Sequence, residues 1–288
     1  MDEREALQLL AADLPHAGDD AAIVGSTAIT IDMLHETTDF PSGTTRYTAG
    51  WRSVAASLSD LAAMGADPTA VVAAYADESF HEEDLQAFVD GAQTVCETVG
   101  AEYVGGDLDH HREFTVTTTA IGEVDQPVLR DGASPGEVVC VTGTLGRSAV
   151  ALELFDRDET DAANRLFRFS PRVETGRALV GTAGAMMDSS DGLARSLHQL
   201  ADASDCGFAI DREQVPIDEA VDRAGIDRWE AGVHFGEDFE LVCTLPESAL
   251  ARAKAETTVP LTKIGRVTTA DRGVTVDGEP LPDRGYTH

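Results

Sequence analysis

Segments with helical and with strand periodicity of apolar residues alternate along the chain. In residues 51–64 the apolar side chains recur at steps of three and four, which predicts an amphipathic helix. Gly65 and Pro68 follow this segment as a helix C-terminal signal, so we expect the helix to end there. Apolar and polar residues alternate in residues 114–122, which predicts a strand with one buried face.

Shorter segments extend the same alternation to both halves of the chain. Ser79 and Glu82 have the spacing of a capping box, so we expect a second helix over residues 79–100. Short strands are predicted at residues 28–31, 71–74, 103–104, 137–142, 185–188 and 240–245, and helices after residue 146, over 172–180 and over 191–203. Residues 131–136 (DGASPG) are dense in turn formers and indicate a linker. We therefore predict an α/β (α+β) protein of two domains, residues 1–130 and 131–288.

The charge of the chain restricts its partners. Of 288 residues, 52 are Asp or Glu and 21 are Lys or Arg, which gives a net charge of −31. Such a surface repels nucleic acid and anionic membranes, so neither is expected as a partner. Hydrophobic residues make up 42 % of the chain, enough for a packed core.

The acidic residues are spread over the whole chain, and Lys254 and Lys263 are its only lysines. This composition suggests a halophilic protein, because carboxylates keep a protein soluble in concentrated salt, where their repulsion is screened. The alternative is an ordinary acidic protein.

Cysteine positions and targeting signals point to a soluble, cytoplasmic protein. Cys96, Cys140, Cys206 and Cys243 form no C-x-x-C pair, so we expect isolated buried thiols rather than a metal or redox site. The acidic start of the sequence does not have the pattern of a signal peptide, and no apolar run approaches the roughly 20 residues of a membrane span.

Some carboxylates stand beside glycines or at the ends of predicted elements, where ligands of α/β proteins gather. They are Asp20, Asp32, Asp107, Asp188 and Asp191, and Asp60 joins this set from within the predicted helix of residues 51–64. Carboxylates that converge need a cation, and oxygen ligands without His or Cys select a hard ion such as Mg²⁺ or Mn²⁺, which often bridges to nucleotide phosphates. For each residue taken alone, a helix cap or a turn is the alternative. The sequence contains no Walker A motif and no protein-kinase motif set.

Several motifs around these residues resemble those of the thiamine-monophosphate kinase family, in the superfamily of aminoimidazole ribonucleotide synthetase and selenophosphate synthetase. The segments that carry the resemblance are GDDAAIV (18–24), SLSDLAAMGADP (57–68), YVGGDL (103–108), LRDGASPGEVVCVTGTLGRSA (129–149), MDSSDGL (187–193), GEDFEL (236–241) and GY (285–286). The resemblance implies the two-domain aminoimidazole-ribonucleotide-synthetase-like fold with mixed sheets, and a homodimer whose N-terminal domain binds ATP and metal and forms the interface. It also implies transfer of the γ-phosphoryl group of ATP to thiamine monophosphate, in line and assisted by several Mg²⁺ ions, to give thiamine diphosphate and ADP.

The resemblance further implies a role for individual residues. Metal binding falls to Asp20, Thr30, Asp32, Asp60, Asp107, Asp188 and Asp191, among which Asp60, Asp107 and Asp188 are assigned to catalysis; ATP contacts fall to Gly106, Asp107, Arg130 and Ser190, and substrate contacts to Asp39, Glu237 and Tyr286. Arg130 is expected to contact phosphate in a bidentate manner. The turn at residues 143–146 either offers helix N-terminal amides to a phosphate or is a packing turn.

This chain departs from the family pattern at Asp39, where the family often has His, and at Ile31, where Thr is frequent. Asp39 would repel an acceptor phosphate unless a metal intervenes, and the alternative is a loop carboxylate on an acidic surface.

Two other function classes stay open at this point. One is a different enzyme of the superfamily, although a selenophosphate synthetase would need a reactive Cys near a glycine-rich N-terminal stretch, and the first cysteine is Cys96 inside a predicted helix. The other is a non-catalytic nucleotide-binding or scaffolding protein, which the retention of all the metal-binding carboxylates disfavours.

Overall fold

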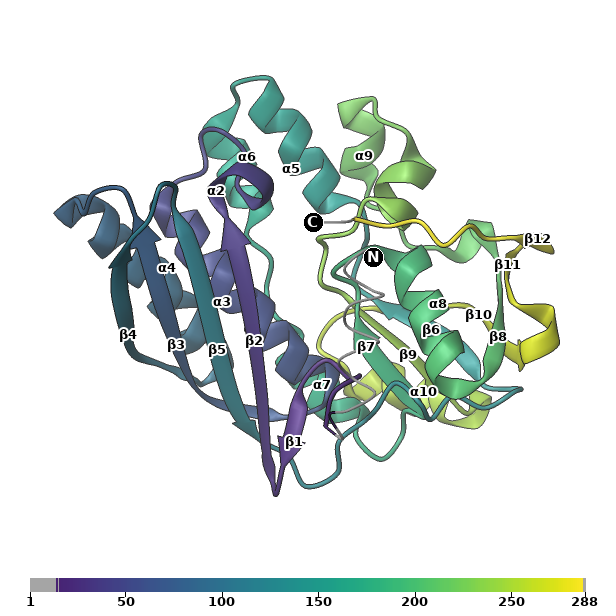
Figure 1. The fold of residues 1–288 in the computed structure, drawn as a ribbon. Helices are drawn as coiled ribbons and strands as arrows, with labels where there is room; N and C mark the ends of the chain where they lie inside the picture. Colours follow the sequence, from purple (N-terminus) through teal and green to yellow (C-terminus); the bar gives the residue numbers. More distant parts are fainter. Residues whose placement is uncertain (1–13, 15, 287–288) are drawn as a thin grey trace.

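The computed structural model describes residue 14 and residues 16–286, whose strands form two mixed sheets (Figure 1). The first has five strands in the order β1-β2-β5-β3-β4, and the second has seven in the order β12-β11-β8-β10-β6-β9-β7. The predicted α/β (α+β) class with mixed sheets is therefore confirmed. All strands of the first sheet precede the predicted linker and all strands of the second follow it. The domain boundary between residues 130 and 131 itself stays a prediction.

The first sheet is covered by helices on one face only (Figure 1). Its elements are β1 Ala22–Val24, β2 Thr27–His35, α2 Glu36–Asp39, α3 Arg46–Ala63, β3 Asp67–Asp77, α4 Glu82–Val99, β4 Glu102–His110 and β5 Thr115–Glu123. α3 and α4 lie side by side against the buried side chains of the sheet, and the opposite face is exposed (Figure 1). A single covered face produces the alternation of polar and apolar residues that identified β5 in the sequence.

The second sheet and its helices contain the C-terminal half of the core. Their elements are β6 Val138–Thr142, α5 Arg147–Asp156, α6 Thr160–Phe167, α7 Val173–Leu179, β7 Ala185–Asp188, α8 Leu193–Ser204, β8 Cys206–Ile210, α9 Glu219–Ala224, β9 Leu241–Leu245, α10 Leu250–Glu256, β10 Leu261–Thr269, β11 Val274–Val276 and β12 Glu279–Pro280, with single turns η1 Arg212–Gln214, η2 Glu230–His234, η3 Glu247–Ala249 and η4 Ala270–Arg272. β6, β7 and β9 are buried along their whole length, because their alternate side chains pack into two core clusters, one on each face of the sheet.

Two local predictions are wrong, and the strands predicted at residues 28–31 and 71–74 are longer than predicted, as β2 and β3. The capping box at Ser79 does not form, because α4 begins at Glu82 after His81, and the Ser79 hydroxyl lies 3.0 Å from the His81 Nε2 atom instead. β4 does not end before the Gly-Gly-Asp segment but runs through it to His110, since pairing with β3 continues to the end of that strand. The end of α3 is as predicted, with Gly65 in the left-handed region at φ 69°.

α3 connects the two halves of the molecule. It packs on α4, β2 and β5 in the first half, and on α7 and β7 in the second. Its buried positions are mostly Ala and Ser, and small side chains allow neighbouring backbones to approach closely. As a result, the C-terminal end of α3 lies at the end of β7, and both carry candidate site residues.

The four cysteines are free and buried, as predicted. Burial raises the pKa of the Cys96 and Cys140 thiols to about 12, so neither is a reactive thiolate at neutral pH. None of the helices in the described part of the chain is both long and apolar enough to cross a membrane.

Candidate active site

Three carboxylates from distant parts of the sequence converge at the junction of the two halves. Asp20 precedes β1, Asp60 lies in the last turn of α3, and Asp188 ends β7. Each offers one ligand oxygen, and the three oxygens lie within 4.8 Å of one another. We call Asp20, Asp60 and Asp188 the carboxylate cluster.

The electrostatics of the carboxylate cluster favour a bound cation. Burial raises the pKa of Asp60 well above its ordinary value, and the charges of Asp32, Asp188 and Asp20 raise it further. The pKa of Asp188 is also raised well above its usual range, first by burial and then by the charge of Asp20. Because a divalent ion would favour the ionised form of both carboxylates and offset their mutual repulsion, and the donors are all oxygen, the residues fit Mg²⁺.

Hydroxyl groups of neighbouring residues donate hydrogen bonds to the carboxylates and fix their orientation. The Thr30 hydroxyl donates to Asp60. Ser57 donates to Asp32 at 2.6 Å, and Ser59 donates to Asp188 at 2.6 Å. The family resemblance assigned Thr30 to the metal ligands, whereas here its hydroxyl bonds a ligand carboxylate. Ser57 and Ser59 were not predicted from the sequence, although they lie on the buried face of α3 within one turn of Asp60.

Arg130 contacts a carboxylate in this structure. Its Nη2 and Nε atoms donate to the two oxygens of Asp20 at 2.8 and 3.2 Å, and its backbone amide donates to Asp19. Both members of the Arg130–Asp20 pair are largely buried, so their attraction is weakly screened by solvent. The guanidinium therefore places one fixed positive charge beside the carboxylate cluster, where it can also meet a phosphate.

The structure does not bring Asp107 and Gly106 to the carboxylate cluster of the same chain. Asp107 is exposed on β4. It belongs to a row of neighbouring residues across the sheet, which continues through Ala74 of β3 and Thr117 of β5 to Met33 of β2. Met33 is exposed, so this row of side chains points to the open face of the sheet, away from α3. Three strand spacings separate β4 from β2, about 14 Å in all.

Gly106 has a structural reason for lacking a side chain. A Cβ atom on it would lie 1.7 Å from the carbonyl oxygen of Ala73 in the neighbouring strand. Pairing between β3 and β4 therefore requires glycine at this position, whether or not a nucleotide contacts it.

The remaining predicted residues lie around the cluster. Asp32 is in β2 with its side chain toward α3, while Ser190 and Asp191 lie in the turn after β7. The carbonyl oxygen of Asp191 accepts a hydrogen bond from the backbone amide of Tyr286 at 3.0 Å. This bond joins the β7 turn to the C-terminal segment.

The three predicted substrate residues line one cavity. Asp39, Glu237 and Tyr286 surround a volume of about 250 Å³, which we call the substrate cavity. Its other walls include Phe40, Phe167, Phe235, Pro41 and Asp156. Aromatic rings and carboxylates in one cavity complement a cationic, aromatic ligand.

Asp39 is not a surface loop carboxylate. It is the last residue of α2 and is buried, and its carboxylate accepts hydrogen bonds from the His35 amide and the Thr38 hydroxyl, each at 2.7 Å. The Tyr286 hydroxyl donates to the carbonyl oxygen of Thr38 at 2.9 Å, which holds the C-terminal segment over this wall.

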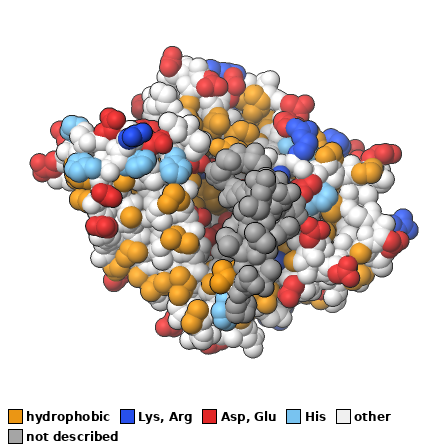
Figure 2. All heavy atoms as spheres, in the orientation of Figure 1, with side chains coloured by type: hydrophobic (Ala, Val, Ile, Leu, Met, Phe, Trp, Pro, Cys, Tyr) orange, Lys and Arg blue, Asp and Glu red, His pale blue; other side chains and the backbone are white. Residues whose placement is uncertain are grey.

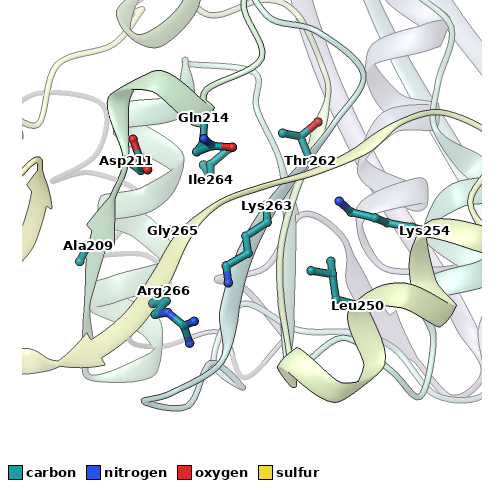
Figure 3. Close-up of a pocket in the computed structure, with 10 residues that line it drawn as sticks. All are labelled: Ala209, Asp211, Gln214, Leu250, Lys254, Thr262, Lys263, Ile264, Gly265 and Arg266. Carbon is teal, nitrogen blue, oxygen red and sulfur yellow. The ribbon is translucent and has the colours of Figure 1, made fainter.

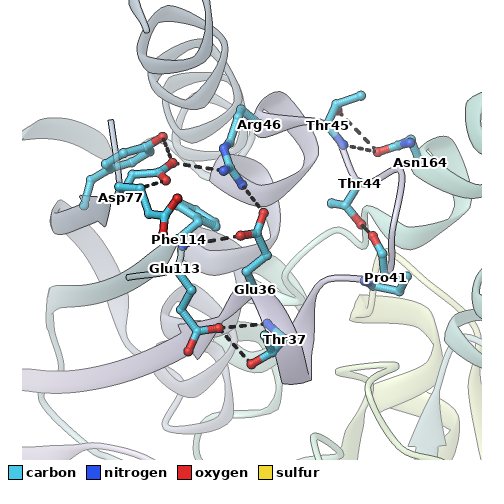
Figure 4. Close-up of polar contacts among 12 residues, drawn as sticks. Glu36, Thr37, Pro41, Thr44, Thr45, Arg46, Asp77, Glu113, Phe114 and Asn164 are labelled. Carbon is cyan, nitrogen blue, oxygen red and sulfur yellow. Dashed lines mark hydrogen bonds and ion pairs between the residues drawn. The ribbon is translucent and has the colours of Figure 1, made fainter. Parts of the chain in front are cut away.

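Polar contacts fix α2, the wall of the substrate cavity that carries Asp39 (Figure 4). Glu113, just before β5, accepts two hydrogen bonds from Thr37, and Arg46 of α3 pairs with Glu36 and with Asp77 of β3. These contacts tie a four-residue helix, too short to be stable alone, to the first sheet and to α3.

Glu237 is held by strained backbone and by a buried arginine. Glu237 and Phe239 have φ angles of 65° and 53°, in a region that non-glycine residues rarely adopt. Arg52 of α3 is 2 % exposed, pairs with the Glu237 carboxylate and lies 3.7 Å from the Phe167 ring centroid. Arg52 was not predicted from the sequence, although an arginine within the apolar stretch of a helix is a recognisable signal.

The turn at residues 143–146 is a packing turn. Asp238 accepts hydrogen bonds from the amides of Gly146 and Ser148 at 2.5 and 3.0 Å, so the N-terminus of α5 already has an anionic partner. Burial raises the pKa of Asp238 to about 7, against the lowering effect of these two bonds. The amides at this end of α5 are therefore not available to a phosphate group.

Comparison with known proteins places the chain in a family. Models of the N-terminal and C-terminal domains of AIR synthase related proteins match residues 18–124 and 134–278. The thiamine-monophosphate kinase of Halobacterium salinarum is 59 % identical over 288 residues, with both chains covered completely. The chain belongs to the thiamine-monophosphate kinase family. The Escherichia coli K12 kinase of the same name is 33 % identical over 94 % of this chain and 90 % of its own.

Solved structures agree with this assignment. A structure described as AaThiL complexed with AMPPCP and TMP has a TM-score of 0.90 at 28 % identity, and covers 100 % of this chain and 97 % of that one. The thiamine-monophosphate kinase of Stenotrophomonas maltophilia K279a has a TM-score of 0.80 at 31 % identity, over 96 % of this chain and 95 % of that one. The family expected from the motifs is therefore confirmed, in preference to aminoimidazole ribonucleotide synthetase and selenophosphate synthetase. Members of the thiamine-monophosphate kinase family are ATP-dependent phosphotransferases.

Proposed function

We propose that this chain transfers the γ-phosphoryl group of ATP to thiamine monophosphate with Mg²⁺ held on the carboxylate cluster. The observation that carries the proposal is the convergence of Asp20, Asp60 and Asp188 at the junction of the two halves. We propose that the site holds several ions, because the charge of Asp32 acts on Asp60 and adds a further carboxylate to the cluster.

The chemistry requires little from the protein besides charge and position. The acceptor is a phosphate monoester, largely a dianion at pH 7 because its second pKa is about 6, so it needs no general base. Mg²⁺ supplies neutralisation of the charge that develops as two polyanions approach each other. Arg130 adds a fixed cation, while Ser59 and Thr30 hold Asp188 and Asp60 in place.

The substrate cavity suits the thiamine part of the acceptor. Thiamine carries a thiazolium cation and an aromatic pyrimidine, which complement the carboxylates and rings of this cavity. We place Asp39 and Glu237 beside the cationic part rather than beside the phosphate. This placement removes the repulsion that Asp39 would otherwise exert on the acceptor phosphate. Arg52 acts as a positioning residue for Glu237.

The function is tested by incubating the chain with ATP, Mg²⁺ and thiamine monophosphate in high salt. We expect ADP and thiamine diphosphate in equal amounts. ADP without thiamine diphosphate would contradict the proposed acceptor. The absence of both products under these conditions would contradict the kinase assignment. Free thiamine serves as the control acceptor, since it has no phosphate to receive the transferred group.

The open face of the first sheet supports a homodimer. Large apolar side chains are exposed on it: Ile29, Ile31, Met33, Val72, Val104 and Ile121. Figure 2 shows hydrophobic side chains gathered over this sheet, on the left of the view. A contiguous apolar surface is unfavourable in water and typical of protein interfaces, and two copies of this face can bury one another.

The same face carries Asp107, whereas Gly106 lies in the row of Ala73 and Thr118 on the covered face. In a dimer built on this sheet, Asp107 lies at the interface, so we propose that Asp107 acts on the metal–nucleotide site of the partner subunit. This arrangement reconciles the role implied for Asp107 with its position away from the carboxylate cluster of its own chain.

Mixed dimers test this arrangement. Asp60→Asn and Asp107→Asn homodimers are each expected to be inactive. A dimer of one subunit of each kind keeps one intact site of two, so random assembly should restore about a quarter of wild-type activity. Co-expression of two differently tagged chains provides the sample. Coexpressed Asp60→Asn and Asp188→Asn chains are the control and should stay inactive. Equal failure of both mixtures would contradict the action of Asp107 on the site of the partner subunit.

We also propose that the protein works in the cytoplasm of a halophile. The substrate ATP is a cytoplasmic metabolite, and the net charge of −31 suits a solvent rich in salt.

A further inference from the structure

Both lysines of the chain line one groove on the second sheet (Figure 3). Lys254 projects from α10, and Lys263 and Arg266 project from β10, around a cavity of about 550 Å³. Ala209 and Leu250 provide an apolar part of its wall. Among 21 cationic residues in the sequence only these two are lysines, so their meeting in one groove is notable for such an acidic chain.

A β-bulge in β10 places Lys263 and Arg266 on the same side of the strand. Lys263 and Arg266 are three residues apart, and in a regular strand side chains three apart point to opposite faces. The register of β10 against β6 shifts between Lys263 and Gly265, which inserts one extra residue. Both side chains consequently reach the same carboxylate oxygen of Glu247, with donor distances of 2.7 and 3.2 Å.

The groove keeps a surplus of positive charge. Glu247 is shared by Lys263 and Arg266, and the Asp211 carboxylate accepts a hydrogen bond from the amide of Glu213 in η1. Lys254 makes no ion pair or hydrogen bond with any residue that the structure describes. Three cations face two carboxylates here, which leaves one positive charge on a molecule of net charge −31.

We propose that this groove binds a small organic anion that carries a phosphate group. Lysine ammonium groups bind phosphate well, and Lys254 lines the same groove as Lys263 and Arg266. The apolar part of the ligand lies on Leu250, which is on the same side of the groove as Lys254 (Figure 3). The volume is within the range of about 300–1,000 Å³ that small-molecule sites occupy. The net charge repels a larger polyanion, such as nucleic acid, which would extend beyond the groove.

The groove is separate from the proposed active site. None of its lining residues belongs to the carboxylate cluster or the substrate cavity. Its occupation can therefore be measured without turnover, and failure of the kinase proposal would not affect the result.

The two lysines also provide the experiment. Selective labelling of lysine side chains with ¹³C and ¹⁵N yields two side-chain signals, both from the groove. AMP serves as the probe, in EDTA so that no divalent ion bridges it to the carboxylate cluster, and at constant molar KCl. Screening at about 1 M salt limits electrostatic effects to about 3 Å, so only direct contact should move the signals.

We expect AMP to shift both signals along a saturable curve, and adenosine to shift neither. Lys254→Gln should weaken AMP binding about tenfold, read from the signal of Lys263, as expected for a lost charge-assisted contact. Arg223→Gln, an exposed cation on α9, is the matched control and should not change the affinity. Shifts that grow linearly with AMP, or that extra KCl reproduces, would overturn the proposal. Equal affinity for inorganic phosphate and for AMP would overturn the proposal that the ligand is an organic anion.

Discussion

Asp60→Asn is expected to lower kcat by about 10³-fold or more without unfolding the protein. Asparagine has the shape of aspartate and can still accept the hydrogen bond of Thr30, so the end of α3 should keep its position. The change removes one of three negative charges that converge within 4.8 Å, and with it much of the attraction for Mg²⁺. Steady-state assays in high salt at saturating ATP measure the loss.

The same substitution should stabilise the metal-free protein. The pKa of Asp60 is raised well above its unfolded value near 4, so its ionised form opposes folding. The free energy of unfolding of the metal-free protein therefore falls as the pH rises from the unfolded pKa toward the folded pKa. Without a charge at this position, the unfolding temperature in EDTA should rise at neutral pH. Addition of Mg²⁺ should raise the unfolding temperature of the wild type and raise that of the variant much less.

Asp90→Asn is the matched control for both measurements. Asp90 is exposed on α4, away from the carboxylate cluster, and should alter neither kcat nor the response to Mg²⁺. Wild-type activity in Asp60→Asn, or an equal response to Mg²⁺ in both variants, would remove Asp60 from the metal site.

Removal of salt is expected to unfold the protein. The Debye length grows from about 3 Å at 1 M salt to about 10 Å at 0.1 M, so carboxylates that are screened from one another at high salt then repel across the surface. With 52 acidic and 21 basic side chains, fewer than half of the acidic residues can be paired one to one. We expect a cooperative loss of helical circular dichroism as KCl is lowered, with recovery when salt is restored.

A variant with fewer surface charges distinguishes repulsion from other effects of salt. Asp90→Asn, Glu97→Gln and Glu102→Gln together remove three exposed charges from the first half of the molecule. The triple variant should unfold at a lower salt concentration than the wild type. Sucrose is the control for KCl, since it favours compact states by exclusion but does not screen charge. A wild type stable in dilute buffer would contradict the halophilic assignment.

The sequence was a good guide to elements whose signal is local. β7 was predicted with the residues the structure shows, and Gly65 ended α3, because buried strands and helix stops depend on neighbouring residues. The capping box predicted at Ser79 was wrong because the same sequence pattern occurs whether the helix begins at that residue or later, and α4 begins at Glu82. β4 was predicted too short because pairing with β3, a distant strand, carries it through two glycines.

The candidate site was predictable residue by residue but not as an arrangement. The motifs named Asp20, Asp60 and Asp188, which do converge, and Asp107, which lies on the other face of the sheet. No local pattern distinguishes these cases, because the face of a strand residue depends on which strands it pairs with and which side the helices cover.

The sequence by itself determined the family, the α/β class, the acidic surface and the residue types of a magnesium–nucleotide site, since motifs and periodicity are properties of the chain order. Only the tertiary structure decided that Asp39, Glu237 and Tyr286 share a cavity, that Arg52 holds Glu237, and that Lys254 and Lys263 meet in one groove. These pairings join residues from different elements, and the packing of α3 between the two sheets and the bulge in β10 create them.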